Sequence, residues 1–219
     1  CPLIDIPLDP LLTPQQNAAK YYKEYNKAKT AEEVLTQQIE QGTAELDYLE
    51  SVLAALSEAE NERDLAQLRE ELTQSGVLSA KQTRNKKMRG KPVQAKPFHY
   101  RTSDGFDVFA GKNNLQNDLL TLKTAFKRDI WFHTQKIHGS HVILVTDGRE
   151  PTDEAMTEAA MIAAYHSRGR SSSLVPVDYT PVRQVKKPAG AKPGMVIYHV
   201  YQTAYVTPNE AEVEKLRVE

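Results

Sequence analysis

The chain has 219 residues, of which 28 are Lys or Arg and 29 are Asp or Glu, so its formal net charge is −1. This length suits one or two domains, and no apolar run approaches the roughly 18 to 20 residues that a membrane span requires. The single Cys excludes an internal disulfide framework and a zinc site built from cysteines alone. Without a signal-peptide pattern, we expect a cytoplasmic protein with no membrane partner. Because the sequence begins with Cys1, we expect a fragment or a processed product.

Charge is unevenly divided along the chain. Residues 1–78 hold 6 basic and 15 acidic residues, a net charge of −9, so the 22 basic and 14 acidic residues of 79–219 give +8. Residues 79–97 contain seven basic side chains, no acidic one and no apolar periodicity. We interpret this run as a basic linker, either simply solvated or following the phosphates of a nucleic acid. Residues 98–206, with 13 basic and 10 acidic residues, would need a local patch to bind RNA.

The first predicted element is one long coiled-coil helix over about 14–57. Thr13 is its expected N-cap and Pro14 suits its first turn. Apolar residues recur along it every three then four positions, which is typical of a coiled coil. This apolar stripe includes Tyr21, Tyr25, Leu35, Ile39, Leu46, Leu49, Leu53 and Leu56. A helix over 61–73 follows but is too short to cover the stripe, so we expect a partner helix from upstream sequence or from a second copy in a homodimer.

From residue 98 onward, short β-prone runs alternate with turn residues. The expected strands are Phe98–Arg101, Phe106–Ala110, Ile130–Thr134, His141–Thr146, Val177–Val185, Met195–Tyr201 and Thr203–Val206. The expected helices run from Asn113 or Asn114 to about Phe126, from Thr152 or Asp153 to about Ser167, and over Pro208–Arg217. This order predicts a compact, antiparallel-rich α+β domain over 98–219, after a coiled-coil domain over 1–78 and the basic linker.

The densest group of aromatic and imidazole side chains lies between residues 131 and 141. The two-residue period of a strand puts Trp131 and His133 on one face. If that face is accessible, the rings can stack on unpaired bases while Lys136 reaches a phosphate. Alternatively, Trp131 fills the core and His133 forms hydrogen bonds within it. A metal site, or a metal-dependent nuclease built on His133, His138 and His141, is less favoured because no acidic residue lies between the histidines.

A second polar group begins with Gly-Lys-Asn-Asn at residue 111, where a strand is expected to end and a helix to begin. Free backbone N–H groups and the helix dipole attract anions there, and Lys112 adds a full charge. Asn113 and Asn117 share a helical face, as do Asn114 and Asp118, and these side chains can read base edges or ribose hydroxyls. Ordinary N-capping by either residue of the Asn-Asn pair explains the pattern equally well.

No Walker loop, dinucleotide fingerprint, His-Glu-x-x-His motif or nucleophile-elbow serine is present, so we expect no enzymatic activity and no cofactor. We expect RNA to contact the polar and basic side chains of the second half instead. These are Lys112, Asn113, Asn114, Asn117, Asp118, Lys123, Arg128, Trp131, His133, Lys136, Ser140 and His141.

Spaced motifs across the chain resemble those of one family. In the first half they are Ile6-Pro7-Leu8-Asp9-Pro10, Asn17-Ala18 and Tyr21-Tyr22-Lys23-Glu24-Tyr25-Asn26-Lys27-Ala28-Lys29. In the second they are Gly111-Lys112-Asn113-Asn114, Asn117-Asp118, Asp129-Ile130-Trp131-Phe132-His133, Gly139-Ser140-His141-Val142 and Val177-Asp178-Tyr179-Thr180. Together they resemble the NFACT family, the group of bacterial RqcH, fibronectin-binding protein A homologues and eukaryotic NEMF. The resemblance implies a coiled-coil segment followed by an NFACT-R RNA-binding domain.

The resemblance further implies a ribosome-associated quality-control factor. Such a factor binds large ribosomal subunits obstructed by peptidyl-tRNA and supports C-terminal alanine tailing by recruiting tRNA. The implied partners are therefore rRNA and tRNA, with the coiled coil reaching toward the stalk-base region of the large subunit. A surface adhesin that binds fibronectin is the alternative, suggested by an older family name.

Overall fold

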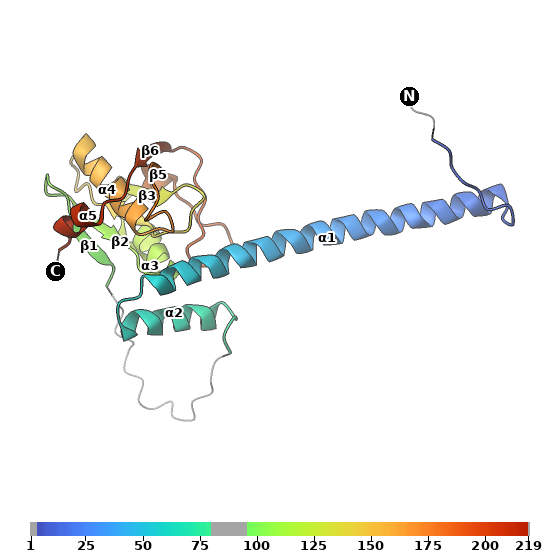
Figure 1. Cartoon of the computed structure of the whole chain (residues 1–219), viewed down its shortest axis with the longest axis horizontal. Helices are drawn as coiled ribbons and strands as arrows, with labels where there is room; N and C mark the ends of the chain where they lie inside the picture. Colours follow the sequence, from blue (N-terminus) through green and yellow to red (C-terminus); the bar gives the residue numbers. More distant parts are fainter. Residues whose placement is uncertain (1–3, 80–95, 219) are drawn as a thin grey trace. The chain divides into compact units, whose positions relative to one another are not determined.

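The computed structural model describes residues 4–79 and 96–218, so most of the predicted basic linker lies outside the described residues. In chain order the elements are α1 (Pro14–Ser57), α2 (Glu62–Gln74), β1 (Phe98–Arg101), β2 (Asp107–Ala110), α3 (Asn114–Leu119), the π-helical turn η2 (Leu120–Thr124), β3 (Ile130–Thr134), β4 (Val142–Leu144), α4 (Asp153–Tyr165), β5 (Val175–Pro181), the 3-10 turn η3 (Val182–Gln184), β6 (Gln202–Val206) and α5 (Glu210–Leu216) (Figure 1). The predicted α+β class is confirmed. No helix in the described ranges has the length and apolarity needed to cross a membrane.

Two compact units divide the chain, Cys1–Asp47 and Tyr48–Glu219. The last turns of α1 and the whole of α2 belong to the second unit together with the sheet, whereas the sequence suggested a boundary near residue 78. Residues of α2 and α3 contact each other. Through this contact α2 belongs with the sheet, so the boundary between the units lies before residue 78 in the chain.

In the first unit, α1 begins at the predicted cap. Thr13 Oγ1 accepts the backbone N–H of Gln16 at 3.3 Å, and Gln16 Oε1 accepts that of Thr13 at 2.8 Å, which is a reciprocal capping box. The buried Asn17 side chain accepts the N–H of Asp9 and donates to the carbonyls of Asp9, Leu12 and Thr13. Asn17 therefore ties the preceding turn to the start of the helix.

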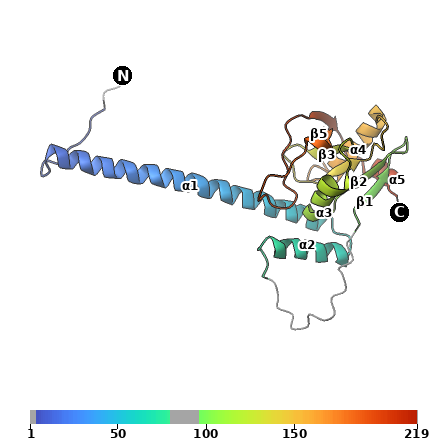
Figure 2. The same ribbon diagram turned by 180° about the vertical axis from the view of Figure 1, so that it is seen from behind.

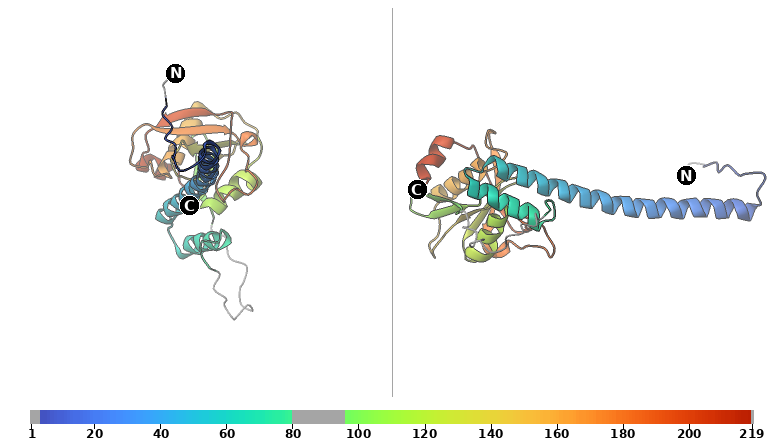
Figure 3. Two further views of the ribbon diagram at one scale, coloured as in Figure 1. Left: turned by 90° about the vertical axis from the view of Figure 1, so that its right-hand side faces the viewer. Right: turned by 90° about the horizontal axis from the view of Figure 1, so that it is seen from below.

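In the second unit, α2 lies beside the last turns of α1 (Figure 3). Tyr48 and Val52, four residues apart on α1, pack with Leu68 of α2. This covered face of α1 differs from the predicted apolar stripe. α2 packs against Tyr48 and Val52, whereas the stripe leucines next to them in sequence are exposed to solvent. The stripe residues that are exposed include Tyr21, Tyr25, Leu35, Ile39, Leu46, Leu49, Leu53 and Leu56.

The six strands form one antiparallel sheet in the order β1-β2-β4-β3-β5-β6. Figures 1 and 2 show the sheet from opposite sides. β1 and β2 form a hairpin. The sequence predicts it, because the Asp104-Gly105 pair between the two β-prone runs is a typical hairpin signal. In its turn, Thr102 Oγ1 accepts the N–H of Phe106 at 2.9 Å, and Gly105 has a φ of 82°. A residue with a side chain rarely adopts that left-handed conformation, which explains the glycine.

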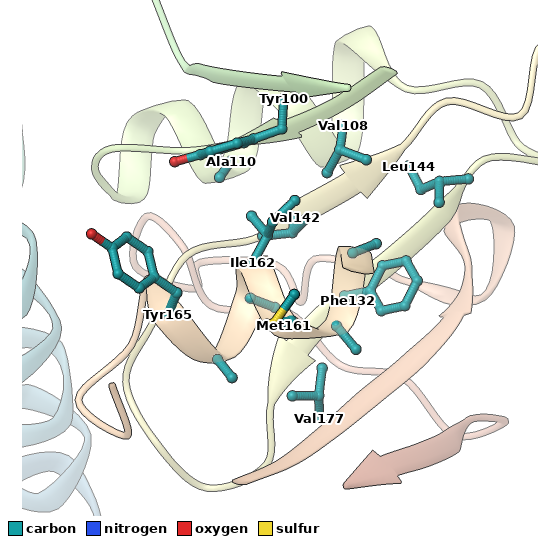
Figure 4. Close-up of a cluster of buried hydrophobic side chains, with 14 of the residues drawn as sticks. Tyr100, Val108, Ala110, Phe132, Val142, Leu144, Met161, Ile162, Tyr165 and Val177 are labelled. Carbon is teal, nitrogen blue, oxygen red and sulfur yellow. The ribbon is translucent and has the colours of Figure 1, made fainter. Parts of the chain in front are cut away.

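Alternating residues of the central strands supply two cores. Phe132, Val142 and Leu144 face α4 in the larger core, where the labelled side chains point toward one another (Figure 4). Trp131 and Ile143 face the opposite side, in a smaller core with residues of η2 and of the segment 182–198. The sheet is therefore buried on both faces at its centre.

Two predicted strands differ from the structure. The expected strand Val177–Val185 ends at Pro181, where β5 passes into η3. The expected strand Met195–Tyr201 forms only an isolated bridge between Ile197 and Lys186. Its Val196 and Tyr198 pack against the smaller core, so the apolar alternation belongs to a segment that covers the sheet face and adds no strand.

Candidate functional site

The predicted N-cap of α3 is confirmed, but its side chain also contacts α2. Asn113 Oδ1 accepts the backbone N–H of Gln116 at 2.9 Å. Its Nδ2 donates to Oε1 of Gln67 at 2.9 Å, and Nε2 of Gln116 donates to the same oxygen at 2.7 Å. Asn113 is buried. Its side chain, predicted to contact base edges, therefore forms hydrogen bonds within the chain instead.

A carboxylate of α2 occupies the predicted anion site. Glu71 is buried, and its Oε1 accepts from Nδ2 of Asn114 at 2.9 Å. Burial raises the pKa of Glu71 above its ordinary value of 4.5, while hydrogen bonds from Asn114, Tyr48 and the backbone N–H of Leu115 and Asn114 act in the opposite direction. At the start of α3, a buried carboxyl group of the same chain therefore lies where the sequence suggested an external phosphate.

Lys112, expected as a free charge, is paired within the protein. Its Nζ lies 3.1 Å from Glu60 Oε2 and 3.3 Å from Asp64 Oδ2, and 4.3 Å from the centre of the Phe98 ring. The side chain is only 9% exposed. Two carboxylates and a ring therefore enclose the cation that the sequence predicts to contact RNA.

Carboxylates at the end of α1 and the start of α2 pair with further basic groups. We call Glu50, Glu58, Glu60 and Asp64 the acidic clamp. Its other pairs are Glu50 with His138 and Arg168 at 3.2 Å each, Glu58 with His166 at 3.0 Å and Arg170 at 3.7 Å, and Glu60 with Arg217 at 2.8 Å. Burial alone would raise the pKa of Glu58, but its hydrogen bond to His166 and the charges of His166 and Arg170 lower it overall. The clamp thus pairs with Lys112, which the sequence predicts to contact RNA, and with Arg168, Arg170 and Arg217.

The Asn-Asp and Gly-Ser-His motifs bind each other. Asn117 Oδ1 accepts the backbone N–H of His141 at 3.0 Å, Gly111 N–H donates to the His141 carbonyl at 3.1 Å, and Ser140 Oγ donates to the Gly111 carbonyl. Burial lowers the pKa of His141 well below its ordinary 6.5, and Nδ1 of the ring lies 2.8 Å from Oγ1 of Thr121. All these side chains are buried. Their hydrogen bonds therefore connect the segment 111–117 to the segment 140–141.

Trp131 is 0% exposed, so of the two interpretations left open by the sequence the structure supports the one in which this ring fills the core. Its ring is stacked on His133 at 5.7 Å between centroids and also contacts His141 at 5.2 Å and Tyr198 at 4.8 Å. The segment 195–201 covers this face, which sequence alternation alone does not reveal. Burial lowers the pKa of His133 to about 4, so its imidazole is neutral near pH 7.

The three clustered histidines do not converge. The rings of His133 and His141 meet edge to face at 5.5 Å, whereas Nε2 of His138 lies 3.2 Å from Glu50. In the described ranges, no group of three or more His, Cys, Asp or Glu side chains could hold a metal ion.

Two buried or half-buried aspartates organise the segment that covers the second sheet face. Asp118 accepts the N–H of Gly194 at 3.1 Å and forms an ion pair with Lys187. Asp178 accepts hydrogen bonds from Tyr198 at 2.9 Å and from Thr203 at 2.6 Å. Sequence reasoning assigned no role to Asp178, although an aspartate inside a β-prone run is a signal for a buried polar contact.

Comparisons with known proteins identify the family. Residues 2–91 match the model of the NFACT N-terminal and middle domains, and residues 96–199 match the NFACT protein RNA binding domain. A solved structure of the C-terminal part of the fibronectin/fibrinogen-binding protein from Streptococcus suis is 41% identical, with a TM-score of 0.83, over 95% of this chain and 82% of that one. The chain belongs to the NFACT family.

Curated relatives extend well beyond this chain. It is 43% identical to the Rqc2 homolog RqcH of Bacillus subtilis and 42% identical to that of Streptococcus suis, each over 216 residues. These matches cover 99% and 98% of the chain but 37% and 38% of the relatives. The chain therefore spans little more than a third of their length.

Within this NFACT chain, three of the predicted RNA-binding residues are exposed cations, namely Lys123, Arg128 and Lys136. In the described part of the chain, none of the three side chains forms an ion pair or hydrogen bond. Arg128 precedes β3 and Lys136 follows it, and five residues of strand span about 17 Å. The structure therefore separates Lys136 from the other two, and their contact with RNA stays a prediction.

Sequence reasoning missed an exposed aromatic residue between two of these cations. Phe126 was interpreted as the end of a helix, but it lies in the turn after η2 and is 75% exposed. The adjacent Lys127 is also exposed. The signal that could have found this group is the run Phe-Lys-Arg at the end of an amphipathic segment, where an aromatic is interleaved with cations.

Proposed function

We propose that this chain is the RNA- and ribosome-binding part of a ribosome-associated quality-control factor. The match of residues 96–199 to the NFACT RNA-binding domain carries the proposal, and the similarity to RqcH over nearly the whole chain supports it. The exposed, unpaired cations supply the electrostatic term with which proteins bind phosphates. The chain acts by binding, without enzymatic activity, in the cytoplasm.

The proposal extends to particular ribosomal partners. The chain binds large ribosomal subunits obstructed by peptidyl-tRNA and supports alanine tailing through tRNA that the whole protein recruits. Segments of the relatives outside this chain take part in that activity, because the chain spans little more than a third of their length. The exposed apolar stripe of α1 pairs with another helix, or with a second copy of this chain, where α1 reaches toward the stalk base.

Cosedimentation with purified large subunits over a range of salt concentrations tests the proposal. We expect binding that weakens steeply with salt, and a Lys123→Gln, Arg128→Gln, Lys136→Gln variant that binds more weakly with a shallower salt dependence. Lys215→Gln is a single-charge control for each of the three substitutions, because Lys215 is exposed on α5 and also lacks an ion pair among the described residues. Absence of binding at low salt would refute the proposal.

A second candidate is fibronectin binding, because the structurally similar Streptococcus suis protein is described as a fibronectin/fibrinogen-binding protein. Surface-immobilised fibronectin can be tested in parallel with large subunits and under the same buffer. Saturable fibronectin binding that survives the triple cation variant, together with absent subunit binding, would favour this candidate.

A further inference from the structure

The turn Phe126–Asp129, between η2 and β3, presents an aromatic ring to solvent beside basic side chains. Phe126 is 75% exposed, and Lys127 and Arg128 follow it directly. Leu122, on the preceding η2, is also exposed. A single exposed apolar residue is ordinary, so the case for a binding site depends on how the turn is held and how its charges are paired.

The turn is held by a buried carboxylate. Asp129 Oδ2 accepts the backbone N–H of Phe126 at 2.7 Å, and Oδ1 accepts the N–H and hydroxyl of Thr146 at 3.0 and 3.2 Å. Asp129 N–H donates back to the Phe126 carbonyl at 3.1 Å. The η2 turn ends immediately before it, with Ala125 N–H donating to the Leu120 carbonyl at 2.8 Å. The backbone under the ring is therefore fixed before any ligand binds, which lowers the entropy cost of binding.

The cations around this turn lack the carboxylate partners that several other cations of the domain have. Lys112, Arg168, Arg170, Lys187 and Arg217 each form an ion pair with a carboxylate. In the described ranges, the exposed side chains of Lys123, Lys127 and Arg128 form none. Exposed Arg183 is adjacent, because its backbone N–H donates to the Lys127 carbonyl at 3.3 Å. Exposed cations without an ion pair also occur elsewhere in the described part of the domain, for example Lys136 and Lys215. At this turn, however, three such cations lie within three residues of an exposed aromatic ring.

We propose that Phe126 stacks on an unpaired RNA base while Lys123, Lys127 and Arg128 contact the neighbouring phosphates. The inference rests on the proposed function and deepens it by naming the site and its ligand, a single-stranded RNA segment. An aromatic face flanked by cations suits a splayed nucleotide, whose base and phosphate are bound by different side chains. A duplex keeps its bases stacked on each other and offers this ring no partner. The concentration of unpaired positive charge favours a polyanion over an apolar peptide.

Fluorescence anisotropy with a single-stranded oligoadenylate and a blunt-ended RNA duplex tests this assignment on the full chain. Phe126→Ala is expected to weaken oligoadenylate binding roughly tenfold, with little change for the duplex. The slope of affinity against salt should be unchanged, because no charge is lost. Lys127→Gln should instead lower that slope by about 0.7 on the single strand. Tyr205→Ala, which removes an aromatic ring that is 67% exposed on β6, is the matched control and should bind normally.

Phe126→Trp supplies an optical readout of stacking. The natural chain has one Trp, Trp131, and it is fully buried. The fluorescence of an indole at the exposed position 126 can therefore be distinguished from that of Trp131, because only the exposed indole is in contact with solvent. Its fluorescence should be quenched by oligoadenylate and not by the duplex, and affinity should be retained or increased because indole also stacks on bases.

The possible results separate the two proposals. If Phe126→Ala binds oligoadenylate as the natural chain does while salt-sensitive subunit binding persists, this inference is wrong and the proposed function stands. If Phe126→Ala loses subunit binding but binds protein-free RNA normally, the turn contacts a ribosomal protein and the inference is equally wrong. If the natural chain binds neither RNA nor subunits, both proposals fail.

Discussion

The Asn117 side chain occupies space that only a glycine at position 111 leaves free. A Cβ built on Gly111 would lie 2.2 Å from Oδ1 of Asn117 and 3.0 Å from its backbone nitrogen. The same Oδ1 accepts the N–H of His141, so it cannot move away without breaking a buried hydrogen bond. The two motifs that contain these residues are therefore linked by packing as well as by hydrogen bonding.

Gly111→Ala is expected to destabilise the domain by about 1–3 kcal/mol, because neither neighbouring atom can yield freely. Asn117→Ala should cost a similar amount, about 1–3 kcal/mol, by leaving the buried His141 N–H without its acceptor. The double variant should cost less than the sum, because removing Asn117 relieves part of the overlap. Urea denaturation of the four chains gives the coupling, and strictly additive losses would show that the two positions act independently.

Glu71 gives a second prediction at this scale, about pH. Its pKa is raised in the folded chain, so the folded state binds a proton more readily than the unfolded state. The stability that this proton supplies is fully present below the ordinary pKa of 4.5 and is lost as pH rises through the folded value.

Glu71→Gln remains neutral at every pH and keeps an acceptor for Asn114. The unfolding free energy of the natural chain minus that of the variant should therefore fall as pH rises from 4.5, and then level off. Denaturation of both chains across this range measures the difference. A difference that rises with pH would mean that the folded state favours the ionised carboxyl.

At the scale of elements, some local patterns are sufficient to specify their structure. The Thr13 cap, the Gly105 hairpin and the alternation of β3 were all predicted because each depends on neighbours within a few residues. The segment 195–201 shows the limit. It alternates like a strand, but only the distant Trp131 and Val185 explain why it lies across a sheet face.

Substitution of two glycines, Gly42 and Gly105, distinguishes the effect of helix propensity on stability from the effect of backbone strain, because neither site is crowded. A Cβ at Gly42, inside α1, or at Gly105, in the β1–β2 turn, would meet nothing within 4 Å. Gly42→Ala should stabilise α1 by about 0.5–1 kcal/mol, because alanine loses less backbone entropy in a helix. Gly105→Ala should destabilise the hairpin by about 1–2 kcal/mol, because φ is 82° there. Circular dichroism during thermal unfolding should show opposite shifts, and two shifts of the same sign would contradict the argument.

At the scale of the whole molecule, the near-zero net charge reflects an acidic first part and a basic second part. The sequence showed that division, but it did not show that Glu50, Glu58 and Glu60 bind basic groups of the second part. Those partners lie far away in sequence; Glu60 and Arg217, for example, are 157 residues apart. Likewise, Glu71 meets Asn114 across 43 residues. Half of the twelve residues predicted to contact RNA are buried, and exposed cations remain among the others; which of them contact RNA stays a prediction.

If the acidic clamp withholds basic side chains from RNA, neutralising it should increase non-specific binding. Glu50→Gln, Glu58→Gln and Glu60→Gln together remove the ionised partner of Arg168 and one of the two ionised partners of Arg170, Arg217 and Lys112. The second partners that remain are Glu210, Glu214 and Asp64. We expect tighter binding to duplex RNA at low salt and a steeper loss of affinity with salt, since more cations can displace counterions. Stability should fall as well, because partly buried charges lose their partners.

The matched control is Glu32→Gln, Glu33→Gln and Glu40→Gln, on the part of α1 in the first unit. These glutamates are exposed and form no ion pair among the described residues, so the control changes net charge by the same amount without releasing a cation. A steeper salt dependence in the clamp variant alone would indicate local pairing. Equal changes in both variants would indicate that only net charge matters, because a long-range field does not depend on which carboxylates are removed.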